Sequence, residues 1–344
     1  MVLLVKTSTH SYPIYLERKC ISSIGNRYNL NRKVMIITDE NIPTSYIETI
    51  KVQCREAHIH VCKSGEGTKS FEVYEAILKE MVSLGFSRKD LVIALGGGVI
   101  GDLSGFVAAT YMRGIDFVNV PTSTLSQIDS SIGGKVAINV EKWKNMVGAF
   151  YPPMAVFIDP NTLVSLPERH FYNGLVEALK AGLIYNKKIV DIMANKDLQD
   201  SIEAILYESL LVKKAVVEED EFEMGLRKIL NFGHTIGHGL ESFYELKDLL
   251  HGEAVALGMW MAIDDDSIKE ALLPIYSKLH QKTSISYEVD AVYDYVIHDK
   301  KAESNEIAFV TIKEIGLAEV QKVPLSDIYK RLEDNVCQVA SEKV

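Results

Sequence analysis

Short apolar segments alternate with segments of helical periodicity through the first half of the chain. Short, mostly apolar segments predict buried strands over residues 33–38, 91–95, 117–120 and 155–158. Apolar positions spaced three and four residues apart predict a helix over 70–84. Such alternation is typical of a parallel sheet covered by helices. We therefore expect the first half to form an α/β domain.

The pattern becomes mainly helical after about residue 160. Helical spacing predicts helices over residues 171–185, 200–219, 226–244 and 252–272. Residues 309–312 and 318–322 are expected to form a small hairpin near the end of the chain. The sequence contains no internal repeat and no low-complexity linker. We therefore expect two domains, an α/β domain over residues 1–160 and a mainly helical domain over residues 161–344.

Composition narrows the class of protein. Of the 344 residues 47% are hydrophobic, which is enough to fill two cores, and the formal net charge is −10. This charge argues against broad nucleic-acid binding, which needs a basic face. The start of the chain lacks the features of a signal peptide, and no apolar run reaches the roughly 20 residues of a membrane span. The 4 cysteines show no CxxC pair. These observations predict a cytoplasmic protein with reduced thiols.

Histidines concentrate in one stretch of the helical half. His234 and His238 stand four residues apart, on one face of a predicted helix, and His251 follows. Imidazole is common in catalytic metal sites, but Thr235 replaces the general-base glutamate of an HExxH protease. Spacing leaves open whether His238 or His251 joins His234. Glu177, on an otherwise apolar helix face, would complete a His-His-Glu site with an open position.

A glycine-rich turn follows the predicted strand 91–95. Residues 96–101 formally match GxGxxG, in which glycines let the backbone approach a pyrophosphate at a helix N-terminus. The fingerprint also expects an acidic residue at the end of the next strand, whereas Asp116 stands at a strand's start. We therefore predict a phosphate-binding loop that departs from the ordinary dinucleotide fold.

A second segment rich in polar side chains and glycines covers residues 121–135. It combines several hydroxyls and one carboxylate with a Gly-Gly-Lys sequence that ends at Lys135, and such a sequence can present an ammonium and backbone amides to a phosphate. Ile128, Ile132 and Val136 recur at four-residue spacing, which predicts that one side of the segment is buried.

Several segments together resemble the 3-dehydroquinate synthase family, within the sugar phosphate cyclase superfamily. The resemblance covers nearly the whole chain and rests on residues 38–41, 65–70, 96–114, 121–135, 144–151, 220–227, 231–238 and 251–253. It implies an NAD-binding domain over 1–160 and a metal- and substrate-binding domain over 161–344. It also implies a divalent metal, zinc or cobalt, and a homodimer.

The activity that the resemblance implies is a carbon–oxygen lyase reaction of aromatic amino acid biosynthesis. The family converts 3-deoxy-D-arabino-heptulosonate 7-phosphate into 3-dehydroquinate and phosphate. Transient oxidation by NAD permits loss of phosphate, and re-reduction and an intramolecular aldol reaction follow. Two alternatives remain open. One is another sugar phosphate cyclase, such as a 2-deoxy-scyllo-inosose synthase, and the other is an alcohol dehydrogenase similar to glycerol dehydrogenase.

The resemblance also implies roles for individual residues. The implied metal ligands are Glu177, His234 and His251. The ribose-binding acid becomes Asp39, and the other implied NAD contacts are Glu66, Lys69, Gly97, Gly98, Val99, Asp102, Thr122, Ser123, Leu125, Asp129, Ser130, Lys144 and Ser165. The implied substrate contacts are Lys135, Asn145, Lys180, Lys213 (or Lys214), Arg227, Asn231, His238 and Lys300 (or Lys301). Arg113 is expected to reach the neighbouring subunit's site.

Overall fold

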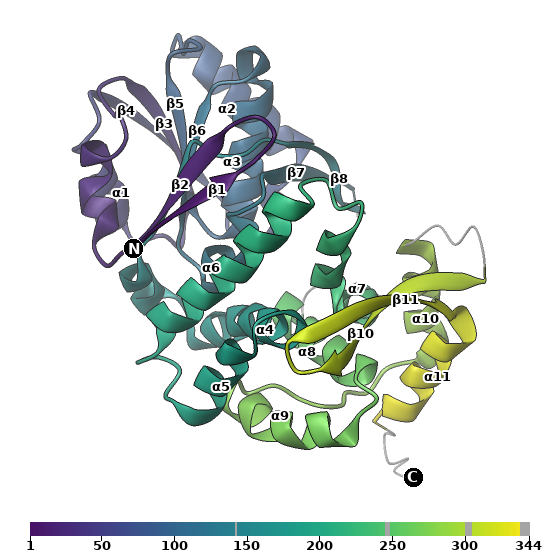
Figure 1. Cartoon of the computed structure of the whole chain (residues 1–344). Helices are drawn as coiled ribbons and strands as arrows, with labels where there is room; N and C mark the ends of the chain where they lie inside the picture. The colour runs from purple at the N-terminus through teal and green to yellow at the C-terminus, as the bar shows by residue number, and fades with distance from the viewer. Residues whose placement is uncertain (142, 245–247, 300–304, 338–344) are drawn as a thin grey trace, which may run out of the picture. The chain divides into compact units, whose positions relative to one another are not determined.

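The computed structural model describes residues 1–141, 143–244, 248–299 and 305–337 (Figure 1). The chain forms two compact units. Unit 1 comprises Met1–Phe171 with Lys213–Glu221, and unit 2 comprises Tyr172–Val212 with Phe222–Val344. Within the part of the chain that the structure describes, none of the helices combines the length and apolar character needed to cross a bilayer.

Unit 1 is built on a seven-stranded sheet in the order β1–β2–β9–β6–β5–β3–β4. Its strands are β1 (Val2–Lys6), β2 (Ser11–Leu16), β3 (Lys33–Asp39), β4 (Glu56–Cys62), β5 (Leu91–Gly96), β6 (Asp116–Pro121) and β9 (Ala155–Ile158). β1 and β2 pair antiparallel, and the other neighbouring pairs are parallel. The four strands predicted in this half are therefore confirmed.

The remaining elements of unit 1 surround the sheet. They are α1 (Thr44–Lys51), α2 (Phe71–Ser83), α3 (Gly98–Thr110), the hairpin of β7 (Lys135–Val140) and β8 (Trp143–Phe150), and the short helices η1 (Cys20–Asn26), η2 (Glu66–Thr68), η3 (Tyr111–Arg113), η4 (Ser126–Ser130) and η5 (Pro160–Ser165). Met35 and Ile37 of β3 contribute to one core with residues of α2 and α3. Val34 and Ile36 contribute to a second core with residues of η1 and α1. Burial on both faces explains why apolar residues predominate in the central strands β3, β5, β6 and β9.

Unit 2 is mainly helical and includes one hairpin. Its elements are α4 (Glu168–Ile184, which starts in unit 1), α5 (Lys187–Asn195), α7 (His234–Phe243), α8 (His251–Ala262), α9 (Asp266–Lys278), α10 (Val289–Asp299), α11 (Leu325–Asn335), η6 (Leu226–Asn231), β10 (Glu306–Glu314) and β11 (Leu317–Pro324). Helix α6 (Ile202–Glu219) contributes residues to both units. β10 and β11 pair antiparallel, which confirms the predicted late hairpin.

Two predicted helices of unit 2 are wrong in extent. The segment 226–244 is divided into η6 and α7 because Gly233 takes a left-handed φ of 78°. The segment 252–272 is divided at Ile263, whose backbone is extended, and α9 begins after Asp265, whose carboxylate caps it. Apolar spacing continues through the first break, whereas the second lies at the polar run Asp264–Ser267, where the capping residue Asp265 marks the start of a new helix.

Helices α7 and α8 approach each other closely through glycines. A Cβ atom on Gly258 would lie 2.0 Å from the Gly233 oxygen, and one on Gly237 would lie 3.1 Å from the Ala254 oxygen. Only a residue without a side chain fits the first of these positions. This close packing accompanies the approach of two side chains, because the rings of His234 and His251, the first residues of α7 and α8, lie 5.2 Å apart between centroids.

We expect Gly258→Ala to lower the free energy of unfolding by about 1–3 kcal/mol, because the added methyl group must push the two helices apart. Denaturant unfolding of the variant and of the parent protein measures this difference. Gly67→Ala is the matched control, because a Cβ atom there would meet nothing within 4 Å. Equal losses of stability in the two variants would contradict the close-packing explanation.

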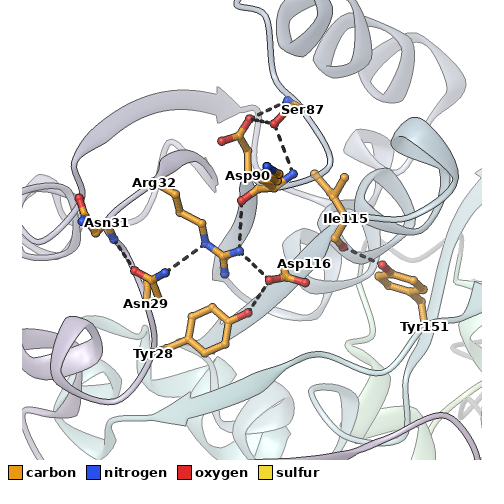
Figure 2. A network of polar contacts seen from close by, with 10 residues as sticks. Tyr28, Asn29, Asn31, Arg32, Ser87, Asp90, Ile115, Asp116 and Tyr151 are labelled. Carbon is orange, nitrogen blue, oxygen red and sulfur yellow. Dashed lines mark hydrogen bonds and ion pairs between the residues drawn. The ribbon is translucent and has the colours of Figure 1, made fainter.

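A polar network joins the amino ends of the parallel strands in unit 1. Asp116 Oδ2 accepts hydrogen bonds from Arg32 Nη1 at 2.6 Å and from the Tyr28 hydroxyl at 2.9 Å (Figure 2). Arg32 immediately precedes β3 and Asp116 begins β6, so both lie at the edge opposite the carboxyl ends of the strands. The Asp116 carboxylate is thus part of a structural network and lies at the wrong edge for a ribose-binding acid.

Candidate active site

Several predicted cofactor contacts gather at the carboxyl ends of the parallel strands in unit 1. Asp39 ends β3, Gly97 and Gly98 follow β5, and Thr122 and Ser123 follow β6. Ligands of open parallel sheets bind at this edge. Burial raises the pKa of Asp39, although the Asn41 N–H opposes this by donating to its carboxylate at 2.9 Å.

The beginning of α3 is built for a close approach of backbone to ligand. A Cβ atom on Gly98 would lie 3.0 Å from Ser130 Oγ, and one on Gly97 would lie 3.4 Å from Ser123 Oγ. No side chain among the described residues caps the amino end of α3. The N–H groups of its first turn are therefore available to an anion such as a phosphate.

A buried lysine organises the polar groups beside this turn. Lys69 Nζ lies 2.7 Å from Asp102 Oδ2 and also donates to Asn145 Oδ1. Asn139 joins the same network, because its Nδ2 donates to Glu66 Oε1 at 2.8 Å and its Oδ1 accepts from the Asn145 N–H at 2.8 Å. Burial raises the pKa of Asp102 to about 6, although the Lys69 ammonium opposes that shift. The structure thus brings together four predicted contacts and adds Asn139, which the sequence analysis missed.

The second half of α6 contributes another ion pair to unit 1. Lys213 Nζ lies 2.6 Å from Asp129 Oδ1, and the Lys213 side chain is mostly buried. Lys214 pairs with Glu218 on the same helix at 2.6 Å. Lys213 is therefore the member of the lysine pair that lies next to another predicted site residue.

The other predicted contacts of unit 1 differ in exposure. Val99, Leu125 and Ser130 are half-buried, whereas Arg113, Lys135, Lys144 and Ser165 are exposed. Ile128, Ile132 and Val136 are buried, which confirms the predicted buried side of their segment. Lys300 and its alternative Lys301 lie outside the described residues.

In unit 2, three potential metal ligands converge from three helices. Glu177 comes from the middle of α4, and His234 and His251 are the first residues of α7 and α8. The Nε2 atoms of His234 and His251 lie 3.7 and 3.5 Å from Glu177 Oε1. The possible ligand atoms all lie within 4.8 Å of one another.

The arrangement fits a divalent cation. With metal–ligand bonds of about 2.1 Å and tetrahedral angles, ligand atoms stand about 3.4 Å apart, close to the observed separations. The Glu177 side chain is only 1% exposed, and among the described residues its Oε2 pairs with the Lys180 ammonium while its Oε1 faces the two imidazoles. A buried carboxylate needs compensating positive charge; the ammonium of Lys180 on the same helix supplies it at Oε2, and a metal ion would supply it at Oε1, between the two imidazoles.

Charges around this group set the protonation states of its members. Burial opposes ionisation of Glu177, but the Lys180 ammonium and the two imidazoles hold the pKa of this carboxyl well below its usual range. Burial and the Lys180 charge hold the pKa of His234 well below its usual range. Burial would lower the pKa of His251, but the carboxylates of Glu177 and Glu241 raise it to about 9. A cation that binds here must therefore displace a proton from His251.

A second potential ligand group adjoins the first. His238, Glu241 and His251 also place possible ligand atoms within 4.8 Å of one another. The His238 ring lies 5.3 Å from the His234 ring and 6.0 Å from the His251 ring, measured between centroids. Glu241 was missed by the sequence analysis, although its spacing of three residues from His238 places it on the same side of α7.

The remaining predicted contacts of unit 2 lie on α4 and η6. Lys180 and Arg227 are each 2% exposed, so both carry a charged head into the interior. Asn231 Nδ2 donates to Glu223 Oε1 at 2.8 Å, and Glu223 takes a left-handed φ of 63°. Glu223 was also missed, because an acidic residue in a polar loop gives no periodic signal.

Comparison with known proteins identifies the family. A family model described as 3-dehydroquinate synthase N-terminal matches residues 59–173, and one described as 3-dehydroquinate synthase C-terminal matches residues 174–302. The chain belongs to the 3-dehydroquinate synthase family. The family predicted from the sequence motifs is thereby confirmed.

Curated members of the 3-dehydroquinate synthase family match nearly the whole chain. The 3-dehydroquinate synthase of Clostridium kluyveri is 37% identical over 94% of this chain and 96% of its own length. The 3-dehydroquinate synthase of Dictyoglomus thermophilum is 40% identical over 96% of this chain and 97% of its own length.

Solved structures confirm the predicted fold class, an α/β domain followed by a mainly helical one. A 2-deoxy-scyllo-inosose synthase solved with carbaglucose-6-phosphate, NAD+ and Co2+ has a TM-score of 0.88 at 24% identity, with 98% of this chain and 100% of that chain covered. A 2-epi-5-epi-valiolone synthase from Streptomyces hygroscopicus, with NAD+ and Zn2+ bound, has a TM-score of 0.83 at 23% identity, with 97% of this chain and 98% of that chain covered.

Proposed function

We propose that this protein is a 3-dehydroquinate synthase that converts 3-deoxy-D-arabino-heptulosonate 7-phosphate into 3-dehydroquinate and phosphate. The observation that carries the proposal is the convergence of His234 and His251 on the buried carboxylate of Glu177, at separations of 3.7 and 3.5 Å that suit a metal. The chain's 37–40% identity to curated synthases over nearly its whole length supports the choice of reaction.

Unit 2 supplies the proposed metal ligands and several substrate contacts. Glu177, His234 and His251 would hold a divalent ion, zinc or cobalt. When bound, the metal would acidify the substrate hydroxyl that is to be oxidised, and NAD would accept the hydride from that carbon. The buried ammonium of Lys180 lies beside Glu177 and would donate a hydrogen bond to a substrate oxygen. His238 and Asn231 would hold the departing phosphate, which can itself accept the proton lost in the elimination.

Unit 1 supplies the proposed NAD site. The glycine turn at the start of α3 would hold the pyrophosphate, and Asp39 at the end of β3 would accept hydrogen bonds from a ribose. The other proposed NAD contacts in this unit are Glu66, Lys69, Val99, Asp102, Thr122, Ser123, Leu125, Asp129, Ser130, Lys144 and Ser165. Lys135 and Asn145 are proposed for the substrate phosphate.

Arg227 and Lys213 are proposed to select the substrate by binding its carboxylate. The Arg227 guanidinium is almost fully buried and presents a planar pair of donors that matches a carboxylate. Heptulosonate substrates have a carboxylate, whereas a glucose phosphate has none. We also propose a cytoplasmic homodimer in which the exposed Arg113 serves the neighbouring subunit's site.

The decisive experiment incubates the purified protein with 3-deoxy-D-arabino-heptulosonate 7-phosphate, catalytic NAD and zinc. We expect stoichiometric release of phosphate without accumulation of NADH at 340 nm, and loss of the reaction on addition of a chelator. Phosphate release only from carboxylate-free sugar phosphates would indicate another cyclase. Net formation of NADH from a simple polyol would indicate a dehydrogenase.

A further inference from the structure

Both ring nitrogens of His251 face carboxylates. Its Nε2 lies 3.5 Å from Glu177 Oε1, and its Nδ1 lies 3.1 Å from Glu241 Oε2. Glu241 lies on α7 and is 5% exposed, so its carboxylate is held inside unit 2. The Glu241 carboxylate, which faces Nδ1 of the His251 ring, has no role in the proposed reaction.

His234 has a comparable arrangement with a different acceptor. Its Nδ1 lies 3.1 Å from the Phe232 carbonyl oxygen. A carbonyl oxygen can only accept a hydrogen bond, so Nδ1 carries the proton and the Nε2 lone pair is left facing Glu177. An ionised carboxylate also only accepts, so Glu241 keeps a proton on Nδ1 of His251 and leaves Nε2 as the nitrogen that gives up its proton when a metal binds.

We propose that Glu241 is a positioning residue of the metal centre. It accepts the Nδ1–H bond of His251 and so fixes the tautomer and the ring orientation that present Nε2 to the metal. This inference rests on the proposed ligand set of Glu177, His234 and His251. Carboxylates that hold a ligating imidazole in this way also raise its basicity as a ligand.

The orientation of the His251 ring depends more on its hydrogen-bond acceptor than that of the His234 ring does. The His251 side chain is 28% exposed, compared with 15% for His234, so packing restrains its ring less. The backbone acceptor of His234 cannot be removed by a substitution, whereas the acceptor of His251 can. Glu241 is therefore the point at which this support can be tested.

The test measures zinc affinity of the full-length protein by competition with a chromophoric chelator, and it records the absorption spectrum of the Co2+ form. We expect Glu241→Ala to weaken zinc binding by about 10–100-fold and to alter the cobalt spectrum. Glu241→Gln keeps an oxygen that can accept the Nδ1–H bond, so its affinity should fall between those of the parent and the alanine variant. If Glu241→Ala fails to fold, the Gln variant carries the test.

Glu208→Gln is the matched control. Glu208 is another buried carboxylate of unit 2, which accepts from Lys188 at 2.6 Å and from Asn186 at 2.9 Å. Its replacement should lower thermal stability and leave zinc affinity unchanged. An equal loss of zinc affinity in the Glu208 and Glu241 variants would reduce Glu241 to a structural role and overturn the proposal.

Other outcomes separate this inference from the proposed function. Wild-type zinc affinity in both Glu241 variants, with zinc lost in Glu177→Gln, would overturn the role of Glu241 alone. Zinc lost in Glu241→Ala but retained in Glu177→Gln would make Glu241 a direct ligand, in a site with His238 and His251. That result would overturn both the positioning role and the proposed ligand set.

Discussion

His234→Ala is expected to abolish stoichiometric metal binding and to lower kcat by about a thousandfold or more. The imidazole is one of three proposed ligands, and the two that remain, Glu177 and His251, cannot enclose the ion. A thousandfold loss corresponds to about 4 kcal/mol, within the several kcal/mol that a metal contributes to transition-state stabilisation. Metal content by elemental analysis and phosphate release under saturating substrate measure the two effects.

His238→Ala provides the comparison on the same helix. His238 follows His234 by one turn of α7, and its ring lies 5.3 Å from the His234 ring. We expect this variant to keep its metal and lose turnover. The reverse outcome, with metal retained in His234→Ala and lost in His238→Ala, would move the ion to the group of His238, Glu241 and His251.

Arg227→Ala is expected to raise KM strongly and to lower kcat/KM at least tenfold, which is about 1.4 kcal/mol or more. The guanidinium is almost fully buried, and loss of one partner of a buried charge pair can cost about 2–5 kcal/mol. Steady-state kinetics with the heptulosonate phosphate measure the change.

Two further variants test whether the effect of Arg227→Ala comes from loss of carboxylate binding. Lys228→Ala removes the exposed positive charge next in sequence, and we expect near-parental kinetics. Arg227→Lys keeps the charge but loses the planar pair of donors, so it should recover only part of the activity. Parental kinetics in Arg227→Ala would remove this residue from the carboxylate site.

The sequence predicts the sheet of unit 1 well because both of its faces are buried. β3, β5, β6 and β9 are mostly apolar, and no regular alternation of polar residues obscures them. The helix break near Gly233 was missed because apolar positions continue across it, and the break after Ile263 was missed because the polar run Asp264–Ser267 also fits one exposed turn of a longer helix. Local backbone geometry decided these boundaries, and the spacing of apolar side chains is insensitive to it.

The sequence predicts only part of the candidate site, because some of its contacts join residues that are distant in the chain. The cluster of histidines is local in sequence, so it is visible as a pattern, although spacing alone did not decide between His238 and His251. The contacts of Lys69 with Asn145 join residues 76 positions apart, and no local pattern can reveal such a pair. Glu241 lies three residues after His238, on the same side of the helix, but a single acidic residue in a helix usually faces solvent and so does not by itself predict a site.

The position of His234 and His251 at the first residues of α7 and α8 has an electrostatic consequence. The amino end of each helix carries about half a positive charge from its aligned peptide dipoles. This partial charge favours oxygen atoms that carry negative charge, such as the Glu177 carboxylate, which the Lys180 ammonium and the two imidazoles also hold ionised. A substrate hydroxyl that loses its proton here would be stabilised by the backbone itself, in an orientation fixed before the substrate arrives.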